Sequence, residues 1–186
     1  RRIDLALLVD VSGSMQATDV APWPSRWHAA RDLAAALVAA LAPGDRVAII
    51  PFAGQAAVTA GLGDGRARAL AALESLPRRD GSRIDLALDL ARETLADGGT
   101  DEPGVVKAAV VLTDGDLNQT EELVLAAAAG AARGAGVVLV AVGLGRDADP
   151  DVLTLVTGDR GRVLLARERA GGDVVAAVLG SLRCTL

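Results

Sequence analysis

Side chains that could bind a metal follow an apolar run near the amino terminus. Residues 3–9 have the composition of a buried strand, and Asp10, Ser12 and Ser14 follow at alternate positions. Hard divalent cations such as Mg2+ prefer carboxylate and hydroxyl oxygens and keep part of their water shell, so a few protein oxygens are enough to hold one. Gly13 allows a tight turn that brings the two hydroxyls together beside Asp10. The sequence therefore predicts an oxygen-ligand metal loop.

Two later segments offer further oxygen donors. A second buried strand is predicted over residues 105–112, and Asp114 follows it in a Thr-Asp-Gly turn. Ligands of open parallel sheets bind at the carboxyl ends of the strands, so Asp114 and Asp10 are expected to face one crevice if their strands are neighbours. Ser82 precedes a helical pattern of apolar residues between positions 84 and 95 and offers another hydroxyl. The predicted site thus draws on three loops.

The three loops together resemble the metal-ion-dependent adhesion site (MIDAS) of von Willebrand factor A (VWA) domains. That family has Asp-x-Ser-x-Ser after its first strand, a Thr after a Gly in a middle loop, and the Asp of a Thr-Asp-Gly after its fourth strand. Asp10, Ser12 and Ser14 match the first motif, and Asp114 matches the last. Ser82 stands where the family has Thr, so the hydroxyl is kept while the methyl group that restricts its rotamer is lost.

The resemblance covers nearly the whole chain. Residues 44–52 are similar to the second strand of the family and its lead-in. Residues 15–20 and 24–26, followed by a helix, are similar to a segment after the metal loop in bacterial membrane-anchored VWA proteins of the aerotolerance type. The chain therefore resembles this bacterial group within the family.

This resemblance implies a metal-dependent, adhesion-type module that binds a protein partner. In such a site the three serine hydroxyls contact the cation directly, while Asp10 and Asp114 hold it directly or through water. A glutamate or aspartate carboxylate of the partner then fills the open position. Mg2+ is the expected cation, with Mn2+ and Ca2+ as alternatives, and the partner's identity stays open. Catalysis is disfavoured because the predicted site offers no general base with a tunable pKa and no activated nucleophile.

The predicted elements indicate an α/β fold. Apolar strands that do not alternate with polar residues, separated by helices, are typical of a parallel sheet covered on both faces. We therefore expect a doubly wound, mainly parallel sheet with helices on both faces and one short antiparallel edge strand. Besides the two strands already named, strands are predicted at 46–52, 137–142 and 162–165, the antiparallel strand at 56–60, and helices at 25–41, 66–76, 82–95, 120–133, 150–156 and 173–182.

Composition bounds the organisation and the partners. The 186 residues, 51% of them apolar, suit a single domain over 1–186, and the start at Arg1-Arg2 without an initiating Met suggests one cut from a longer protein. A net charge of −5 argues against nucleic acid as a partner. No stretch reaches the roughly 18 apolar residues of a membrane-spanning helix, so contact with a membrane is expected only through segments outside this chain. The compartment stays open, with an extracytoplasmic or membrane-tethered soluble domain of a bacterial protein as one interpretation.

Other interpretations of the same loops remain open. Ser12 and Ser14 also suit a turn or a helix cap, and the domain also suits a metal-free VWA scaffold. A haloacid-dehalogenase-like phosphatase, a Mg2+-dependent hydrolase, also has an Asp nucleophile after its first strand. It expects a second Asp where this chain has Ser12, and the only lysine, Lys107, lies inside a predicted strand.

Several residues near these loops have no assigned role. Asp116 and Asn118 continue an alternation that begins at Asp114, but Gln119 and Leu125 stand where a calcium-binding EF-hand loop needs Gly and Glu. We expect Asp116 and Asn118 to cap the next helix or to line the rim of the site. The roles of Asp19, Trp23 and Trp27 stay open, and Trp23 suits either a partner contact or packing at the sheet edge.

Overall fold

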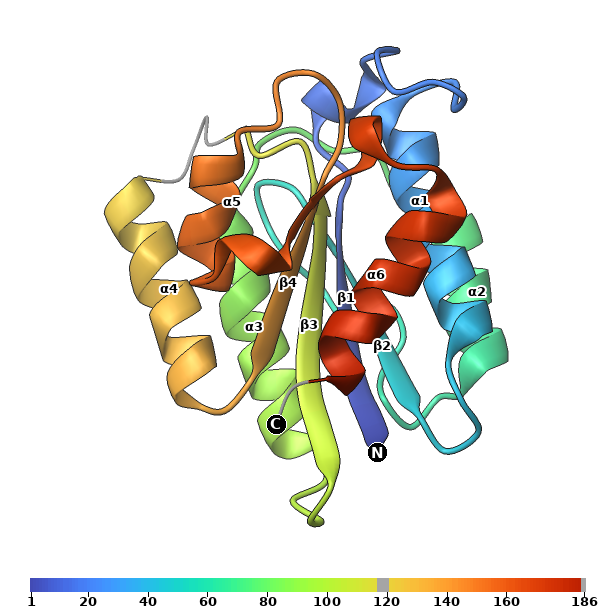
Figure 1. The fold of residues 1–186 in the computed structure, drawn as a ribbon, viewed down its shortest axis with the longest axis vertical. Coiled ribbons are helices and arrows are strands. Elements are labelled where there is room, and N and C mark those ends of the chain that lie inside the picture. The colour runs from blue at the N-terminus through green and yellow to red at the C-terminus, as the bar shows by residue number, and fades with distance from the viewer. Residues whose placement is uncertain (117–120, 185–186) are drawn as a thin grey trace.

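The computed structural model describes residues 1–116 and 121–184. Within these residues, a sheet of five parallel strands runs in the order β2-β1-β3-β4-β5 (Figure 1). Because β1 pairs with both β2 and β3, the loop after β1 lies between the loops that follow its two neighbours. The strands are β1 (Arg2–Asp10), β2 (Arg46–Phe52), β3 (Val105–Thr113), β4 (Val138–Gly143) and β5 (Val163–Leu165).

Helices cover both faces of the sheet (Figure 1). The helices α1, α2 and α6 pack on one face and α3, α4 and α5 on the other. Short 3-10 turns follow β1, α5 and β5, at Gly13–Gln16, Arg160–Arg162 and Ala166–Glu168. The helices are α1 (Arg26–Ala40), α2 (Arg66–Glu74), α3 (Ile84–Asp97), α4 (Glu122–Gly134), α5 (Pro150–Thr157) and α6 (Gly171–Arg183).

Strand β1 belongs to two cores because successive side chains of a strand point to opposite faces. Leu5 and Leu7 pack into the core under α1, α2 and α6, whereas Ala6 and Leu8 pack into the core under α3 and α4. Every residue of β1 from Ile3 to Asp10 is buried. The doubly wound parallel fold predicted from the continuous apolar strands is confirmed.

One predicted element is wrong. Residues 56–60, all within the described part of the chain, form no strand; two isolated antiparallel bridges join Ala56 to Phe52 and Ala60 to Ile49. The backbone N–H of Ala57 donates to the carbonyl of Pro51 at 3.3 Å, but Pro51 has no N–H to donate in return. The ladder is interrupted at that residue.

The fourth helix was expected from Thr120, which lies outside the described residues together with Asn118 and Gln119; the described part of α4 begins at Glu122. Among the described helices, none is long and apolar enough to cross a membrane.

Candidate metal centre

The carboxylate of Asp10 is fixed across two neighbouring strands. Asp10 is the last residue of β1 and is fully buried. Its Oδ1 accepts a hydrogen bond from the backbone N–H of Ser12 at 2.9 Å, and its Oδ2 accepts one from the hydroxyl of Thr113 at 2.6 Å. Thr113 ends β3, and its own hydroxyl oxygen accepts from the N–H of Gly115 at 3.0 Å. The first and third loops of the predicted site are therefore joined through one carboxylate.

The surroundings of Asp10 disfavour its negative charge. Burial raises the pKa of this carboxyl to about 6, and the nearby charge of Asp114 acts in the same direction. The hydrogen bonds from Ser12 and Thr113 stabilise the ionised form and lower the pKa, but they do not offset burial. A cation beside Asp10 would favour its ionised form.

Ser12, Ser14 and Ser82 line one pocket. The Oγ atoms of Ser12 and Ser14 lie 3.1 Å apart, and Ser82 is buried. The volume, about 240 Å³, is enough for an ion and several waters. We call it the serine pocket. Its lining residues are Ser12, Gly13, Ser14, Asp80, Gly81, Ser82 and Asp116.

The loop that carries Ser82 is held by two backbone hydrogen bonds to the segment that follows β2. The N–H of Gly54, just after β2, donates to the carbonyl of Asp80 at 2.9 Å, and the N–H of Arg83 donates to the carbonyl of Ala53 at 2.8 Å. Gly81 has a φ of +86°, a conformation that a side chain would strain. The N–H of Arg79 also donates to the carbonyl of Val11 at 3.0 Å, so this segment lies beside the loop after β1.

Asp114 lies behind the serine pocket and is held by an arginine. Its carboxylate is buried and does not line the pocket. Its Oδ1 accepts from the backbone N–H of Asp116 at 3.2 Å, and its Oδ2 accepts from Nη1 of Arg26 at 2.9 Å. Of the predicted site residues, the structure thus brings the three serines to one pocket and places Asp10 and Asp114 next to it.

Arg26, the first residue of α1, was missed by the sequence analysis. Its side chain is only 5% exposed. Besides Asp114, it contacts Asp19 through two hydrogen bonds of 2.7 and 2.6 Å and Asp147 through one of 2.8 Å. Gly145 leaves room for it, because a Cβ there would lie 2.1 Å from Nε of Arg26. Arg26 therefore joins three loops at the carboxyl edge of the sheet.

This network gives Asp19 a structural role. The guanidinium of Arg26 holds the pKa of the Asp19 carboxyl well below its usual range, and Asp19 in turn raises the pKa of Arg26. The backbone N–H of Arg146 also donates to Asp19, at 2.9 Å. Only the Asp and Arg residue types, seven positions apart, pointed to this pair in the sequence.

The structure also places the two tryptophans and Asp116. Trp23 is half-buried and packs on the core, where a Cβ on Gly171 would lie 3.2 Å from its ring. Trp27 is 8% exposed, with Arg78 stacked on its ring at 5.1 Å. Both tryptophans therefore pack within the fold. Asp116 lines the rim of the serine pocket, as expected.

Comparisons with known proteins identify the family. A profile of the von Willebrand factor type A domain matches residues 5–116, more than half of the chain. A UPF0353 protein of Mycolicibacterium vanbaalenii is 34% identical over 119 residues, which are 61% of this chain and 35% of that protein. The chain thus spans about a third of the length of this relative.

Solved structures show the same fold. An aerotolerance-related membrane protein from Bacteroides fragilis, with multiple mutations to serines, superimposes with a TM-score of 0.80 at 24% identity, over 98% of this chain and 100% of that one. Two others are described with a metal. The mussel byssus proximal thread matrix protein 1 with a zinc-occupied MIDAS motif has a TM-score of 0.74 at 21% identity, over 97% of this chain and 46% of that one.

The second is the manganese-loaded TRAP protein of Plasmodium vivax. It has a TM-score of 0.78 at 19% identity, over 97% of this chain and 73% of that one. Identities this low establish the shared fold. Together with the profile match over residues 5–116, the five-stranded parallel sheet and the placement of the Asp-x-Ser-x-Ser loop show that this chain belongs to the von Willebrand factor type A domain family.

Proposed function

We propose that this VWA domain is a metal-dependent protein-binding module, in which a divalent cation links the chain to a carboxylate of a partner protein. The observation that carries the proposal is the convergence of Ser12, Ser14 and Ser82 on one pocket beside the buried carboxylate of Asp10. The zinc and manganese described for two proteins of the same fold support a divalent cation.

The donor set suits a hard cation. Among residues 1–116 and 121–184, no group of three or more His, Cys, Asp and Glu side chains is placed to hold a metal, so hydroxyl oxygens must supply part of the shell. Hydroxyls and carboxylates favour Mg2+ or Mn2+ over softer ions. We propose Mg2+, with Ser12, Ser14 and Ser82 as direct ligands and Asp10 and Asp114 as direct or water-bridged ones.

A carboxylate of a partner would bind at the serine pocket only through the cation. Asp80 and Asp116 line the pocket, and the single charge of Arg26 is shared by Asp114, Asp19 and Asp147. A divalent cation held mainly by neutral hydroxyls keeps part of its positive charge. A glutamate or aspartate carboxylate from a partner would complete both its coordination and its charge.

Calorimetric titration with Mg2+ and Mn2+ tests the metal site. We expect saturable binding to the wild-type domain and its loss in Asp10→Asn and Asp114→Ala, with the circular dichroism spectrum retained. Asp64→Asn is the matched control, because Asp64 is an exposed carboxylate outside the serine pocket. Wild-type affinity in both site variants would refute the proposal.

A metal-free scaffold is the second candidate function, and one observation favours it. The ion pair of Arg26 with Asp114 gives a buried carboxylate a positive partner without any cation. If the wild-type domain binds neither Mg2+ nor Mn2+ while folding normally, the scaffold function replaces the metal-dependent one.

The phosphatase alternative gains no support. Lys107, the only lysine, pairs with Asp101 at 2.6 Å at the start of β3, the end of the strand opposite to the serine pocket. Neither histidine nor lysine lines that pocket.

The pair of Ser25 and His28 has a structural role. The hydroxyl of Ser25 and Nδ1 of His28 lie 2.8 Å apart, and Ser25 is the N-cap of α1.

A further inference from the structure

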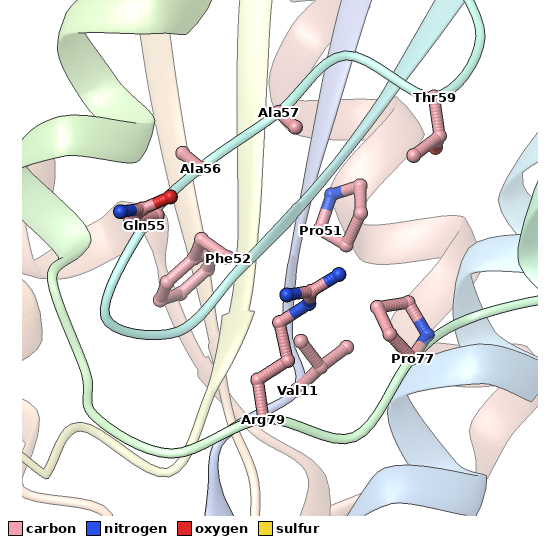
Figure 2. A pocket seen from close by; sticks show the side chains of 9 residues that line it. All are labelled: Val11, Pro51, Phe52, Gln55, Ala56, Ala57, Thr59, Pro77 and Arg79. Carbon is pink, nitrogen blue, oxygen red and sulfur yellow. The ribbon is translucent and has the colours of Figure 1, made fainter.

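A second pocket lies at the carboxyl end of β2 (Figure 2). Its walls are mostly apolar, and its volume of about 160 Å³ has room for one branched aliphatic side chain. We call it the proline pocket. Its lining residues are Val11, Pro51, Phe52, Gln55, Ala56, Ala57, Thr59, Pro77 and Arg79.

The two pockets are built on the same chain segments. Val11 of the proline pocket lies between Asp10 and Ser12, and Arg79 precedes Asp80 of the serine pocket. The backbone N–H of Arg79 donates to the carbonyl of Val11 at 3.0 Å, which fixes the two segments side by side. The two pockets are therefore neighbours on the surface.

The side chain of Arg79 gives the proline pocket a positive charge. In Figure 2 its guanidinium lies at the pocket between Pro51 and Pro77. Arg79 is exposed, and its side chain makes no hydrogen bond or ion pair with any described residue. Two nearby arginines do have partners, because Arg78 stacks on Trp27 and Arg83 pairs with Asp85. Arg79 is therefore available to an acidic ligand.

We propose that the proline pocket and Arg79 select the partner residue two positions from the metal-bound carboxylate, an inference that rests on the proposed function. The occupant is an acidic, extended segment of a protein partner with a branched aliphatic residue two positions from its glutamate or aspartate. Residues two apart in an extended peptide point to the same side, about 7 Å apart. The carboxylate binds at the serine pocket, the aliphatic side chain fills the proline pocket, and Arg79 complements the acidic charge.

NMR titration of the 15N-labelled domain with short peptides tests this inference. The probes are acetylated pentapeptides of serine, in which one glutamate and one leucine are separated by one serine in either order. Matched peptides carry alanine in place of leucine. In saturating Mg2+ we expect at least one leucine peptide to bind about tenfold more tightly than its alanine match, because it buries additional apolar surface.

Four variants test whether the preference for leucine arises at the proline pocket and whether Arg79 contributes to binding. Ala57→Phe fills the proline pocket and should abolish the preference for leucine, whereas Val58→Phe, at an exposed neighbour outside the pocket lining, should keep it. Arg79→Gln should weaken binding of the leucine peptide several-fold. Arg68→Gln, which changes an exposed arginine of α2 outside the pocket lining, should leave it unchanged.

The outcomes separate the inference from the proposed function. Equal affinities for leucine and alanine peptides, no binding at millimolar peptide, or an unchanged preference in Ala57→Phe would overturn the inference. If binding needs Mg2+ but shows no preference for leucine, the inference fails alone. If the affinity and the preference for leucine are both unchanged in EDTA, the proline pocket stands as a peptide site and the metal-dependent function fails.

Discussion

The guanidinium of Arg26 donates a hydrogen bond to Oδ2 of Asp114 at 2.9 Å, and both side chains are buried. Arg26, the first residue of α1, thus positions Asp114, one of the two predicted acidic metal ligands. Its hydrogen bond goes to Oδ2 of Asp114 and not to Oδ1. The same guanidinium holds Asp19 and Asp147. The loops after β1, β3 and β4 are therefore fastened at one point beside the serine pocket.

Replacement of Arg26 should destabilise the domain strongly. In Arg26→Gln, Asp19 and Asp114 lose their charged partner, and removal of one member of a buried ion pair costs about 3–5 kcal/mol. Urea unfolding measures the loss in free energy. Arg31→Gln, which breaks the more exposed pair with Asp32, and Asp147→Asn, whose side chain is 82% exposed, should each cost less than about 1 kcal/mol. A similar cost for all three variants would contradict the role of Arg26.

Removal of the Thr113 hydroxyl should affect both stability and metal affinity. Thr113→Val keeps the shape of the side chain but removes a donor to the buried carboxylate of Asp10. We expect a loss of about 1–3 kcal/mol in unfolding free energy and weaker Mn2+ binding at neutral pH. The control is Thr94→Val, because the Thr94 hydroxyl donates to a backbone carbonyl within α3. Unchanged Mn2+ affinity in Thr113→Val would contradict the proposed alignment of Asp10.

The raised pKa of Asp10 predicts a pH dependence for the metal-free domain. The folded pKa of about 6 exceeds the ordinary value of 3.8, so the folded state binds the proton more tightly than the unfolded state. The contribution of Asp10 to stability is therefore fully present below about pH 4 and is lost as the pH rises through 6. Between pH 7 and pH 5 the wild type in EDTA should gain stability relative to Asp10→Asn. Parallel stability curves for the two proteins would contradict this pKa.

The same proton competes with the cation. Mn2+ affinity of the wild type should fall as the pH decreases from 7 to 5, since protonated Asp10 no longer offers a full carboxylate. Calorimetric titration at several pH values measures this effect. A constant affinity over this range would show that Asp10 does not contribute its charge to the site.

Restoration of the family's threonine at position 82 should tighten metal binding. The methyl group of Ser82→Thr restricts the rotamer of the hydroxyl, so less entropy is lost when the cation is held. Because Ser82 is only 2% exposed, the added methyl group should also cost about 1 kcal/mol in stability. Mn2+ titration and urea unfolding measure the two effects, with Ser75→Thr, outside the serine pocket, as the control. Unchanged or weaker Mn2+ binding would show that the rotamer of this hydroxyl is not limiting.

The sequence predicted best those features that depend on residues close together in the chain. Asp10, Ser12 and Ser14 follow a buried strand within five positions, and the Gly-Ser sequence at Ser82 precedes a clear helical pattern. The parallel sheet follows from continuous apolar strands, which need helices on both faces. The failed edge strand is also local, because Pro51 cannot donate to the ladder.

The contacts that fix the site were beyond the sequence analysis because they join distant positions. Arg26 and Asp114 are 88 positions apart, and Thr113 and Asp10 are 103 apart. An arginine at the start of a helix and a threonine at the end of a strand are ordinary in any sheet protein. The strand order places β1 beside β3, which brings Thr113 to Asp10, and the start of α1 at the same edge of the sheet brings Arg26 to Asp114.

Anomalous diffraction from crystals soaked in MnCl2 tests the metal site most directly. We predict one strong peak in the serine pocket, with the hydroxyl oxygens of Ser12, Ser14 and Ser82 about 2.0–2.6 Å away. Crystals of Asp10→Asn under the same conditions should show no peak there. A wild-type pocket without a peak at saturating Mn2+, or a peak held by other residues, would contradict the metal-dependent function.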